Sequence, residues 1–367
     1  MVKNVFSRID LSSFITGSTE HTWQPTMTSE TNIPSYWLNW RFFVCAIFVL
    51  TSLFLSSYLI WRYEGPIKRK KRGDDQSLEL EQLTGVVYDD ESWNTSVKEI
   101  HPNWLLGFRV FGFVVLLGLI SGNAIADGTG IFIFYTQWTF TLVTIYFGVW
   151  LFFTLSCRLD VLQLGSLVSI YRFRSPDNGE NRVSIVDEEQ GTYRPPGNAE
   201  NSNVFKSSSG HDRENMSTRQ VATTLGYIHQ ILFQTCAGAV LLTDGVFWFI
   251  IYPFLTAKDF NLDFFIVIMH SVNAIFLLGE TFLNSLRFPL FRVSYFVVWT
   301  GIFVLFQWIV HACVSFWWPY PFLDLSSSYA PLWYAAVGLM HIPCFGIFAL
   351  IVKLKHLWLS RCYSEGT

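Results

Sequence analysis

The sequence predicts an all-α fold, a polytopic membrane bundle of seven transmembrane helices with the N-terminus outside or luminal and the C-terminus cytosolic. Three observations predict it. Apolar runs of about 20 residues, the length that crosses a bilayer, recur seven times. Only 14% of the residues are charged, against about 25% in soluble domains. Aromatic residues reach 18%, and the mean hydropathy is +0.33.

The predicted membrane domain covers residues 37–352, between a flexible N-terminal tail (1–36) and a basic cytosolic tail (353–367). The N-terminal tail carries Gly, Ser, Thr and Pro without periodicity, which is typical of an unstructured segment. We expect the seven helices at about 42–61, 108–126, 131–156, 225–252, 264–286, 293–317 and 331–352.

The first three predicted helices have recognisable ends. The first begins beside Trp37 and Trp40, which are typical of a membrane interface, and stops before the basic run KRKKR. The second is rich in glycine, which permits close helix packing. The third follows a short turn and opens with the aromatic segment FYTQWT. A long connection comes next, and its middle, about 174–218, has the composition of a disordered loop.

The last four predicted helices carry polar side chains at membrane depth. The fourth contains Asp244 near its outer end, and the fifth carries a polar stripe. The sixth contains His311 and runs into the aromatic segment WWPYPF, which is typical of an interfacial belt. The seventh contains Pro343, which predicts a kink.

The distribution of basic residues predicts the orientation. Of 25 Lys and Arg residues, 21 fall on one predicted side, and the other side keeps only Lys3, Arg8, Arg41 and Lys258. The side with the excess is expected to be cytosolic. The two glycosylation sequons, at Asn94 and Asn215, lie on that side, so we expect both to be unmodified.

The fifth helix carries its polar residues on one face. His270, Asn273, Glu280 and Asn284 fall within a sector about 80° wide on a helix of 100° per residue. Polar groups facing lipid are costly, so this stripe must face the bundle interior, another polar group or water.

Four polar residues from four helices are expected to share one layer near the outer leaflet. At about 1.5 Å per residue, Thr136, His270 and His311 lie roughly 8–9 Å below the outer ends of their helices, and Asp244 about 12 Å below. A hydroxyl beside an imidazole is a minimal activated nucleophile, and a carboxylate behind the imidazole orients it. The alternative is structural, because membrane threonines bond their own backbone and membrane histidines bond neighbouring helices.

Metal and cofactor chemistry is not indicated. The four membrane histidines (His229, His270, His311, His341) are dispersed in depth, and no two share a helix at ligand spacing. HExxH, CxxC, P-loop and dinucleotide-binding patterns are absent from the sequence. We expect no cofactor, no metal and no nucleic-acid partner. Membrane lipids are the expected partners.

The segments FYTQWT (Phe134–Thr139), HSVNA (residues 270–274) and WPYPFL (Trp318–Leu323) follow one another along the chain. Together they resemble the motif set of the androgen-induced-protein and rolling-stone family, (Y/L)Tx(W/L), HxxNA or HTxxxP, and VYPFL or WPYPFL. The resemblance covers about two thirds of the chain. The chain departs from it in an additional N-terminal helix and a long inner loop.

The resemblance implies a threonine-type membrane hydrolase of acyl-lipid esters, of the class of fatty-acid esters of hydroxy fatty acids. The family threonine matches Thr136, with Thr139 one turn later as the alternative, and the family histidine matches His270. The expected supporting residues are Asp244, His311, Asn273 and Glu280.

Two other functions fit the sequence. Rolling-stone members suggest a non-catalytic adaptor or receptor-like protein, in which the cytosolic loop would dominate function. A proton-coupled transporter would use Asp244, His270 and Glu280. In each case the expected location is the endoplasmic reticulum or the plasma membrane, and the oligomeric state is open.

Overall fold

The computed structural model describes residues 29–65, 87–88, 91, 95–97, 99–163, 222, 224–255 and 262–364. Regular structure in these ranges is helical, apart from isolated bridge residues such as the pair Thr95 and Asn284. Most of the predicted N-terminal tail and the predicted disordered loop lie outside the described residues. The chain divides into two compact units, residues 154–219 and the remainder, and the helices below are described within the second.

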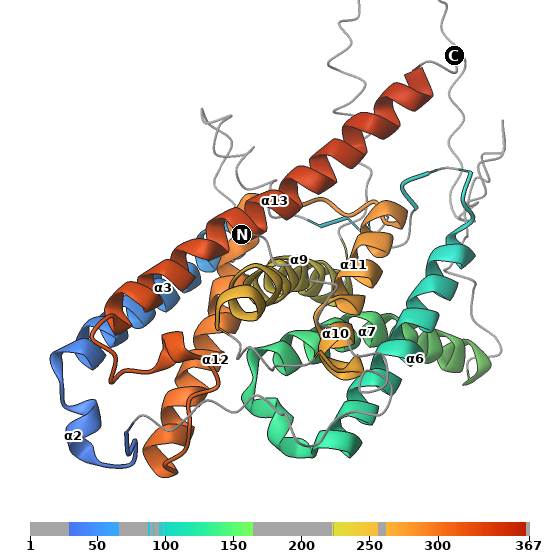
Figure 1. Cartoon of the computed structure of the whole chain (residues 1–367). Helices are drawn as coiled ribbons and strands as arrows, with labels where there is room; N and C mark the ends of the chain where they lie inside the picture. Colours follow the sequence, from blue (N-terminus) through green and yellow to red (C-terminus); the bar gives the residue numbers. More distant parts are fainter. Residues whose placement is uncertain are drawn as a thin grey trace, which may run out of the picture. The chain divides into compact units, whose positions relative to one another are not determined.

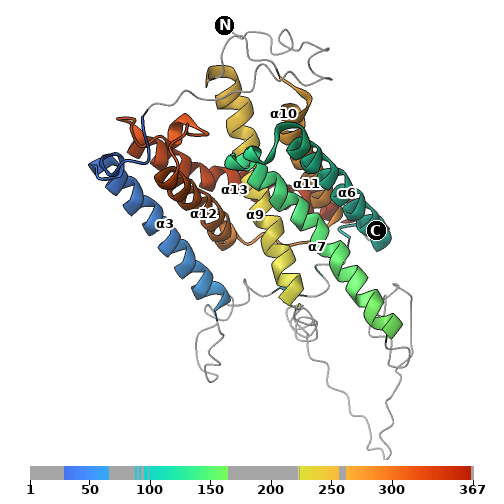
Figure 2. The ribbon, with the colours of Figure 1, turned by 90° about the horizontal axis from the view of Figure 1, so that it is seen from below.

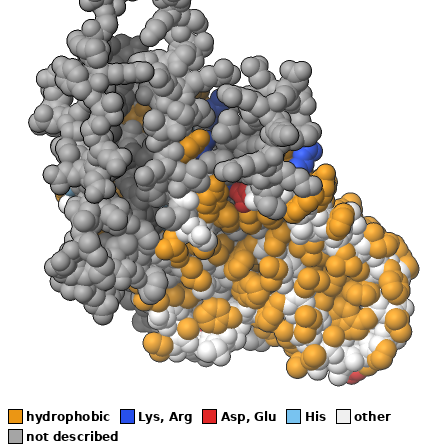
Figure 3. All heavy atoms as spheres, turned by 180° about the vertical axis from the view of Figure 1, so that it is seen from behind, with side chains coloured by type: hydrophobic (Ala, Val, Ile, Leu, Met, Phe, Trp, Pro, Cys, Tyr) orange, Lys and Arg blue, Asp and Glu red, His pale blue; other side chains and the backbone are white. Residues whose placement is uncertain are grey.

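Six helical segments are long and apolar enough to cross a membrane, so the chain is a multi-pass membrane protein. They are Trp40–Glu64, Asn103–Asp127, Thr224–Phe254, Phe264–Leu283, Leu290–Cys313 and Ala330–Cys362. The face in Figure 3 shows the expected exterior, because hydrophobic side chains dominate wherever the described residues are visible. Large apolar side chains such as Phe54 and Ile342 are accordingly exposed.

The elements follow the order predicted from the sequence. They are α2 (Pro34–Trp37), α3 (Trp40–Glu64), α6 (Pro102–Asp127), η2 (Thr129–Ile133), α7 (Tyr135–Gln163), α9 (Thr224–Val246), η3 (Phe247–Leu255), α10 (Phe264–Met269), α11 (Val272–Leu283), η4 (Leu290–Arg292), α12 (Val293–Cys313), η5 (Pro321–Leu323) and α13 (Ala330–Ser364). Helix α7, the predicted third span, is not among the six membrane candidates within the described ranges.

Side chains at the helix ends explain several boundaries. The Asn39 side chain accepts a hydrogen bond from the Phe42 amide at 3.1 Å, which caps α3. Pro102 occupies the first turn of α6, where its missing N–H costs nothing. Gly128, at φ 78°, ends α6 in a conformation that favours glycine. Asp263 caps α10 by accepting from the Ile266 amide at 2.7 Å.

Helix α9 is the central helix of the larger unit. The apolar window of its membrane segment is 67% buried, against 17–39% for the other five candidates. It packs against α11, α12 and α13, and α3 packs against α12 and α13 on the outside of that group (Figures 1 and 2). A Cβ at Gly238 would collide with the Phe296 ring, so this glycine allows α9 and α12 to approach closely.

Two irregular segments lie next to each other in this bundle. The predicted fifth helix, 264–286, corresponds to the membrane candidate Phe264–Leu283, but it is interrupted, because α10 ends at Met269 and α11 starts at Val272. The end of the predicted fourth helix is a π-helix, η3. The Trp248 indole in η3 donates to the His270 carbonyl at 2.7 Å, which satisfies a backbone oxygen near the break. Irregular backbone at membrane depth is tolerated where it is buried or lines a cavity.

The two last helices also end away from their predicted positions. Helix α12 stops at Cys313 rather than at residue 317, and the aromatic segment that follows forms a loop with the short η5. Helix α13 continues past residue 352 to Ser364, so the first part of the predicted basic tail is helical. Hydrophobic periodicity indicates a helix but does not locate its ends.

Candidate functional site

One cavity joins the irregular segments to the start of α7. Its volume is about 400 Å³, which is within the range of small-molecule sites. The end of α6, η2, the first turn of α7, η3, α10 and the loop before η5 each contribute to it. The lining residues are Asn123, Asp127, Gly130, Ile131, Phe134, Thr136, Gln137, Phe247, Ile251, Asp263, Phe265, Ile266, Met269, His270, Trp317 and Tyr320.

Thr136 and His270 both line this cavity. Thr136 is the second residue of α7 and is 6% exposed. Its Oγ1 lies 3.4 Å from the Tyr320 hydroxyl oxygen. His270 lies at the break between α10 and α11, and its ring stacks on Phe247 with centroids 3.7 Å apart and planes within 4°. A hydroxyl and an imidazole from different helices therefore border the same space.

Asp244 lies behind the imidazole. Its Oδ1 is 3.7 Å from His270 Nδ1, and each side chain is 11% exposed. That separation is too long for a hydrogen bond, and in the described structure neither atom has a hydrogen-bond partner. The charges are nevertheless close enough to interact. Because Nδ1 is buried against Asp244, Nε2 is the ring nitrogen left for the cavity.

Asn273 lies close behind this pair and is completely buried. Its Oδ1 accepts from the Ala274 amide at 2.8 Å, and its Nδ2 has no hydrogen-bond partner in the described structure. It does not line the cavity. The expected supporting role of Asn273 therefore stays a prediction.

Glu280 lies in a separate polar cluster. Its Oε1 accepts from Arg109 Nη2 at 2.6 Å, from the Tyr146 hydroxyl at 2.8 Å and from Asn284 Nδ2 at 3.3 Å. The carboxylate is completely buried and does not line the cavity. The polar stripe of the fifth predicted helix faces inward, but its two halves meet different partners.

His311 also lies outside the cavity lining. Its ring stacks on Trp318 with centroids 3.7 Å apart, and Nδ1 is bonded to the Gln307 carbonyl at 2.8 Å. Those contacts hold the aromatic loop against α12. The expectation that His311 shares one site with Thr136 and His270 finds no contact to support it among the described residues.

The alternative nucleophile, Thr139, is completely buried and does not line the cavity. Its hydroxyl is 3.1 Å from the Thr243 hydroxyl, which in turn donates to the Ala239 carbonyl at 2.7 Å. These bonds connect α7 to α9. Of the two threonines, only Thr136 borders the cavity.

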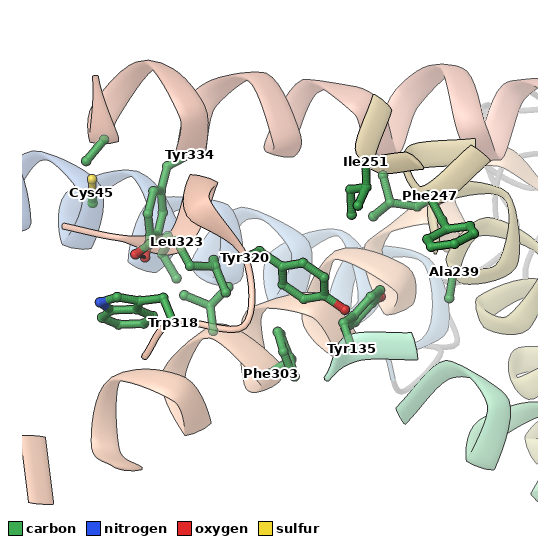
Figure 4. Packing of buried hydrophobic residues seen from close by; sticks show 14 of the residues in the cluster. Cys45, Tyr135, Ala239, Phe247, Ile251, Phe303, Trp318, Tyr320, Leu323 and Tyr334 are labelled. Atoms are coloured by element: carbon green, nitrogen blue, oxygen red, sulfur yellow. Dashed lines mark hydrogen bonds between the residues drawn. The ribbon is translucent and has the colours of Figure 1, made fainter. Parts of the chain in front are cut away.

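Sequence reasoning missed five polar residues of the cavity, one of which is Asn123 near the end of α6. Tyr320 belongs to the WPYPFL segment, which was interpreted as an interfacial belt, and its phenol points toward Tyr135 at the start of α7 (Figure 4). Asp127, Asp263 and Gln137 also line the space. The motif position of Tyr320 was a usable signal. The other four lie at or near helix ends, where the sequence pattern does not separate a functional residue from a boundary residue.

Burial shifts the pKa of two groups outside the membrane segments. It raises the pKa of Tyr320, although the hydrogen bond with Thr136 opposes the change. The Tyr320 hydroxyl therefore stays protonated at neutral pH and can donate. Burial also raises the pKa of Asp263; the amide of Ile266 opposes this shift, and the nearby Asp127 charge adds to it.

No group of three or more His, Cys, Asp or Glu side chains in the described ranges is arranged to hold a metal ion. No family model matches this chain, and neither does a curated protein or a solved structure. The similarity of its motifs to the androgen-induced-protein and rolling-stone family therefore stays a prediction.

Proposed function

We propose that this chain is a membrane hydrolase of acyl-lipid esters in which Thr136 is the nucleophile and His270 the general base. One observation carries the proposal. Both side chains line a single cavity, although they come from different helices and are 134 positions apart in the chain. The charge of Asp244 behind the imidazole adds the third member of a nucleophile, base and orienting carboxylate.

The chemistry follows from these positions. His270 Nε2 takes the proton of the Thr136 hydroxyl while Thr136 Oγ1 bonds to the acyl carbon. The ester C–O bond breaks, and the imidazolium returns its proton to the departing alkoxide. Water then repeats the sequence: His270 takes a proton from water, the hydroxide bonds to the acyl carbon, and the acyl–threonine bond breaks with protonation of Thr136.

Two neighbours suit the intermediates of this reaction. Asp244 stabilises the imidazolium that forms when His270 is protonated. The Tyr320 hydroxyl, 3.4 Å from Thr136 Oγ1, is a donor for the negative oxygen that develops on the acyl carbon. Aromatic and aliphatic side chains such as Phe265 and Met269 line the rest of the cavity and suit an acyl chain.

The proposal includes α7 as a seventh span, with the N-terminus outside and the C-terminus cytosolic. Helix α7 has 29 residues, so it is roughly 43 Å long at 1.5 Å per residue, more than a bilayer core requires. Its Phe140, Tyr146 and Phe147 are completely buried in a core cluster. The cavity would then lie near the luminal surface of the endoplasmic reticulum membrane or the outer surface of the plasma membrane, and a glycan on Asn215 would contradict this orientation.

The transporter alternative needs Glu280 to exchange protons with Asp244 and His270. Glu280 is instead held by Arg109 in a buried ion pair and does not line the cavity that His270 borders. The adaptor alternative depends on residues 174–218, which lie outside the described residues. The hydrolase is therefore the function that the described geometry supports best.

The test is covalent labelling of the full-length protein with a fluorophosphonate probe for serine and threonine hydrolases. Thr136→Val and His270→Gln are expected to lower the labelling rate by about 10³-fold or more, because they remove the nucleophile or its base. Thr139→Val is the matched control, one turn along α7 with its hydroxyl bonded in the core. Labelling that is unchanged by Thr136→Val or by His270→Gln would contradict the proposal.

A further inference from the structure

The cavity has an acidic end. Asp127 is the last residue of α6, and Asp263 comes directly before α10, so two carboxylates border the same space. The charge of Asp127 adds to the rise in the pKa of Asp263 that burial causes. One Asp263 oxygen accepts from the Ile266 amide. Among the described residues that line the cavity, none is Lys or Arg.

A buried amide adds a second acceptor to this cavity. Gln137 lies on the first turn of α7 and is 7% exposed, and its Oε1 has no hydrogen-bond partner in the described structure. A buried amide oxygen without a donor is costly. A ligand with N–H or polarised C–H groups would supply what this oxygen lacks.

Aromatic rings border the cavity as well. The rings of Phe134 and Trp317 both line it, and their centroids are 5.7 Å apart. The faces of aromatic rings attract cations, Trp most strongly. Carboxylates, an unpaired amide oxygen and an aromatic pair are a combination that favours a positively charged group and disfavours a negative one.

We propose that the acidic end of the cavity binds the ammonium head group of an amphiphile whose acyl chain occupies the apolar part. This inference rests on the proposed function and deepens it, because it names the substrate class as an acyl ester with a cationic head group. It departs from the class that the motif resemblance implies, since fatty-acid esters of hydroxy fatty acids carry a free carboxylate. Asp127 and Asp263 would repel that carboxylate.

The test uses three photoreactive probes with the same 16-carbon chain and a trimethylammonium, hydroxyl or carboxylate head. The protein is full-length Thr136→Val, so labelling does not depend on turnover. We expect the ammonium probe to label cavity peptides about tenfold more than the carboxylate probe, which corresponds to about 1.4 kcal/mol. In Asp127→Asn/Asp263→Asn the ratio should fall to about twofold or less.

The variants are matched to the local structure. Asparagine at 263 keeps a capping side chain for α10. Glu30→Gln removes an exposed charge outside the cavity lining and should leave the ratio unchanged. Should the double variant fail to elute as a folded monodisperse protein, Asp127→Asn alone alters only an exposed helix-end residue and should lower the ratio by about half.

The outcomes separate this inference from the proposed hydrolase. Equal labelling by the ammonium and carboxylate probes, or a preference that survives loss of both carboxylates, overturns the inference even where ester hydrolysis depends on Thr136. A preference that is lost with the carboxylates supports the inference even where no hydrolysis is found, because labelling of Thr136→Val measures binding alone.

Discussion

Two hydroxyl–imidazole pairs can be compared among the described residues, and one of them lines the cavity described above. In the first, Thr136 and His270 line the space without contacting each other in a hydrogen bond. In the second, Thr300 Oγ1 is 2.9 Å from His341 Nε2. His341 Nδ1 is 3.0 Å from the Val337 carbonyl, which can only accept, so Nδ1 carries the proton and Nε2 accepts from Thr300.

The second pair has the better hydrogen-bond geometry and the worse access. His341 is 4% exposed, and Thr300 is also bonded to the Tyr135 hydroxyl at 2.8 Å, so the pair connects α7, α12 and α13. Neither residue lines the cavity. A hydrogen-bonded hydroxyl–imidazole pair inside a membrane bundle therefore serves to join helices, whereas a catalytic pair must leave space for the substrate.

The largest difference between the two pairs is expected when each imidazole is removed in turn. His270→Gln should lower ester turnover by about 10³-fold or more, because the general base is lost. His341→Gln should keep turnover per folded molecule within about threefold and lower the free energy of unfolding by about 1 kcal/mol, the value of one buried hydrogen bond. Steady-state hydrolysis and thermal unfolding in detergent measure the two effects.

The opposite result, with turnover lost in His341→Gln and retained in His270→Gln, would move the active site to the second pair. Equal losses of turnover in both variants, without loss of folded protein, would contradict the claim that the cavity pair is catalytic and the core pair is structural. Thr139→Val again serves as the control for removal of a buried polar group on α7.

The buried pair of Arg109 and Glu280 is expected to affect the stability of the protein rather than its turnover. Glu280→Gln removes the carboxylate that neutralises a buried guanidinium, so the free energy of unfolding should fall by about 3–5 kcal/mol. Arg109→Met/Glu280→Leu should recover much of that loss, because both charges are gone. Denaturant unfolding in mild detergent checks the change. A stable Glu280→Gln protein with greatly reduced turnover would instead assign Glu280 to the chemistry.

The smallest effect is expected at the residue behind the catalytic base. Asp244→Asn keeps the shape of the side chain but removes its charge, so turnover should fall roughly 10²-fold through kcat rather than KM. In the His270→Gln background the same substitution should cost almost nothing, because the imidazolium that it stabilises no longer forms. Additive losses in the two backgrounds would show that Asp244 acts independently of His270.

Residue periodicity predicted the faces of the helices but not their partners. The stripe of His270, Asn273 and Glu280 was correctly expected to face the interior, since a polar group facing lipid is costly wherever the bundle places it. The estimate of depth along each helix also predicted that Thr136, His270 and Asp244 lie in one region. It failed for His311, because depth along a helix does not say which neighbour the side chain faces.

Run length and hydropathy are local properties of the chain, so the amino-acid sequence was enough to predict an all-helical, multi-pass membrane protein. It also predicted Thr136 and His270 as the candidate catalytic residues. The folded structure was needed to show that these two residues border one cavity and that Asp244 faces the imidazole. It was also needed to show that Glu280 pairs with Arg109 instead. The break at His270 and the π-helix η3, which contains Pro253, interrupt the regular helices at points that hydrophobic periodicity does not locate.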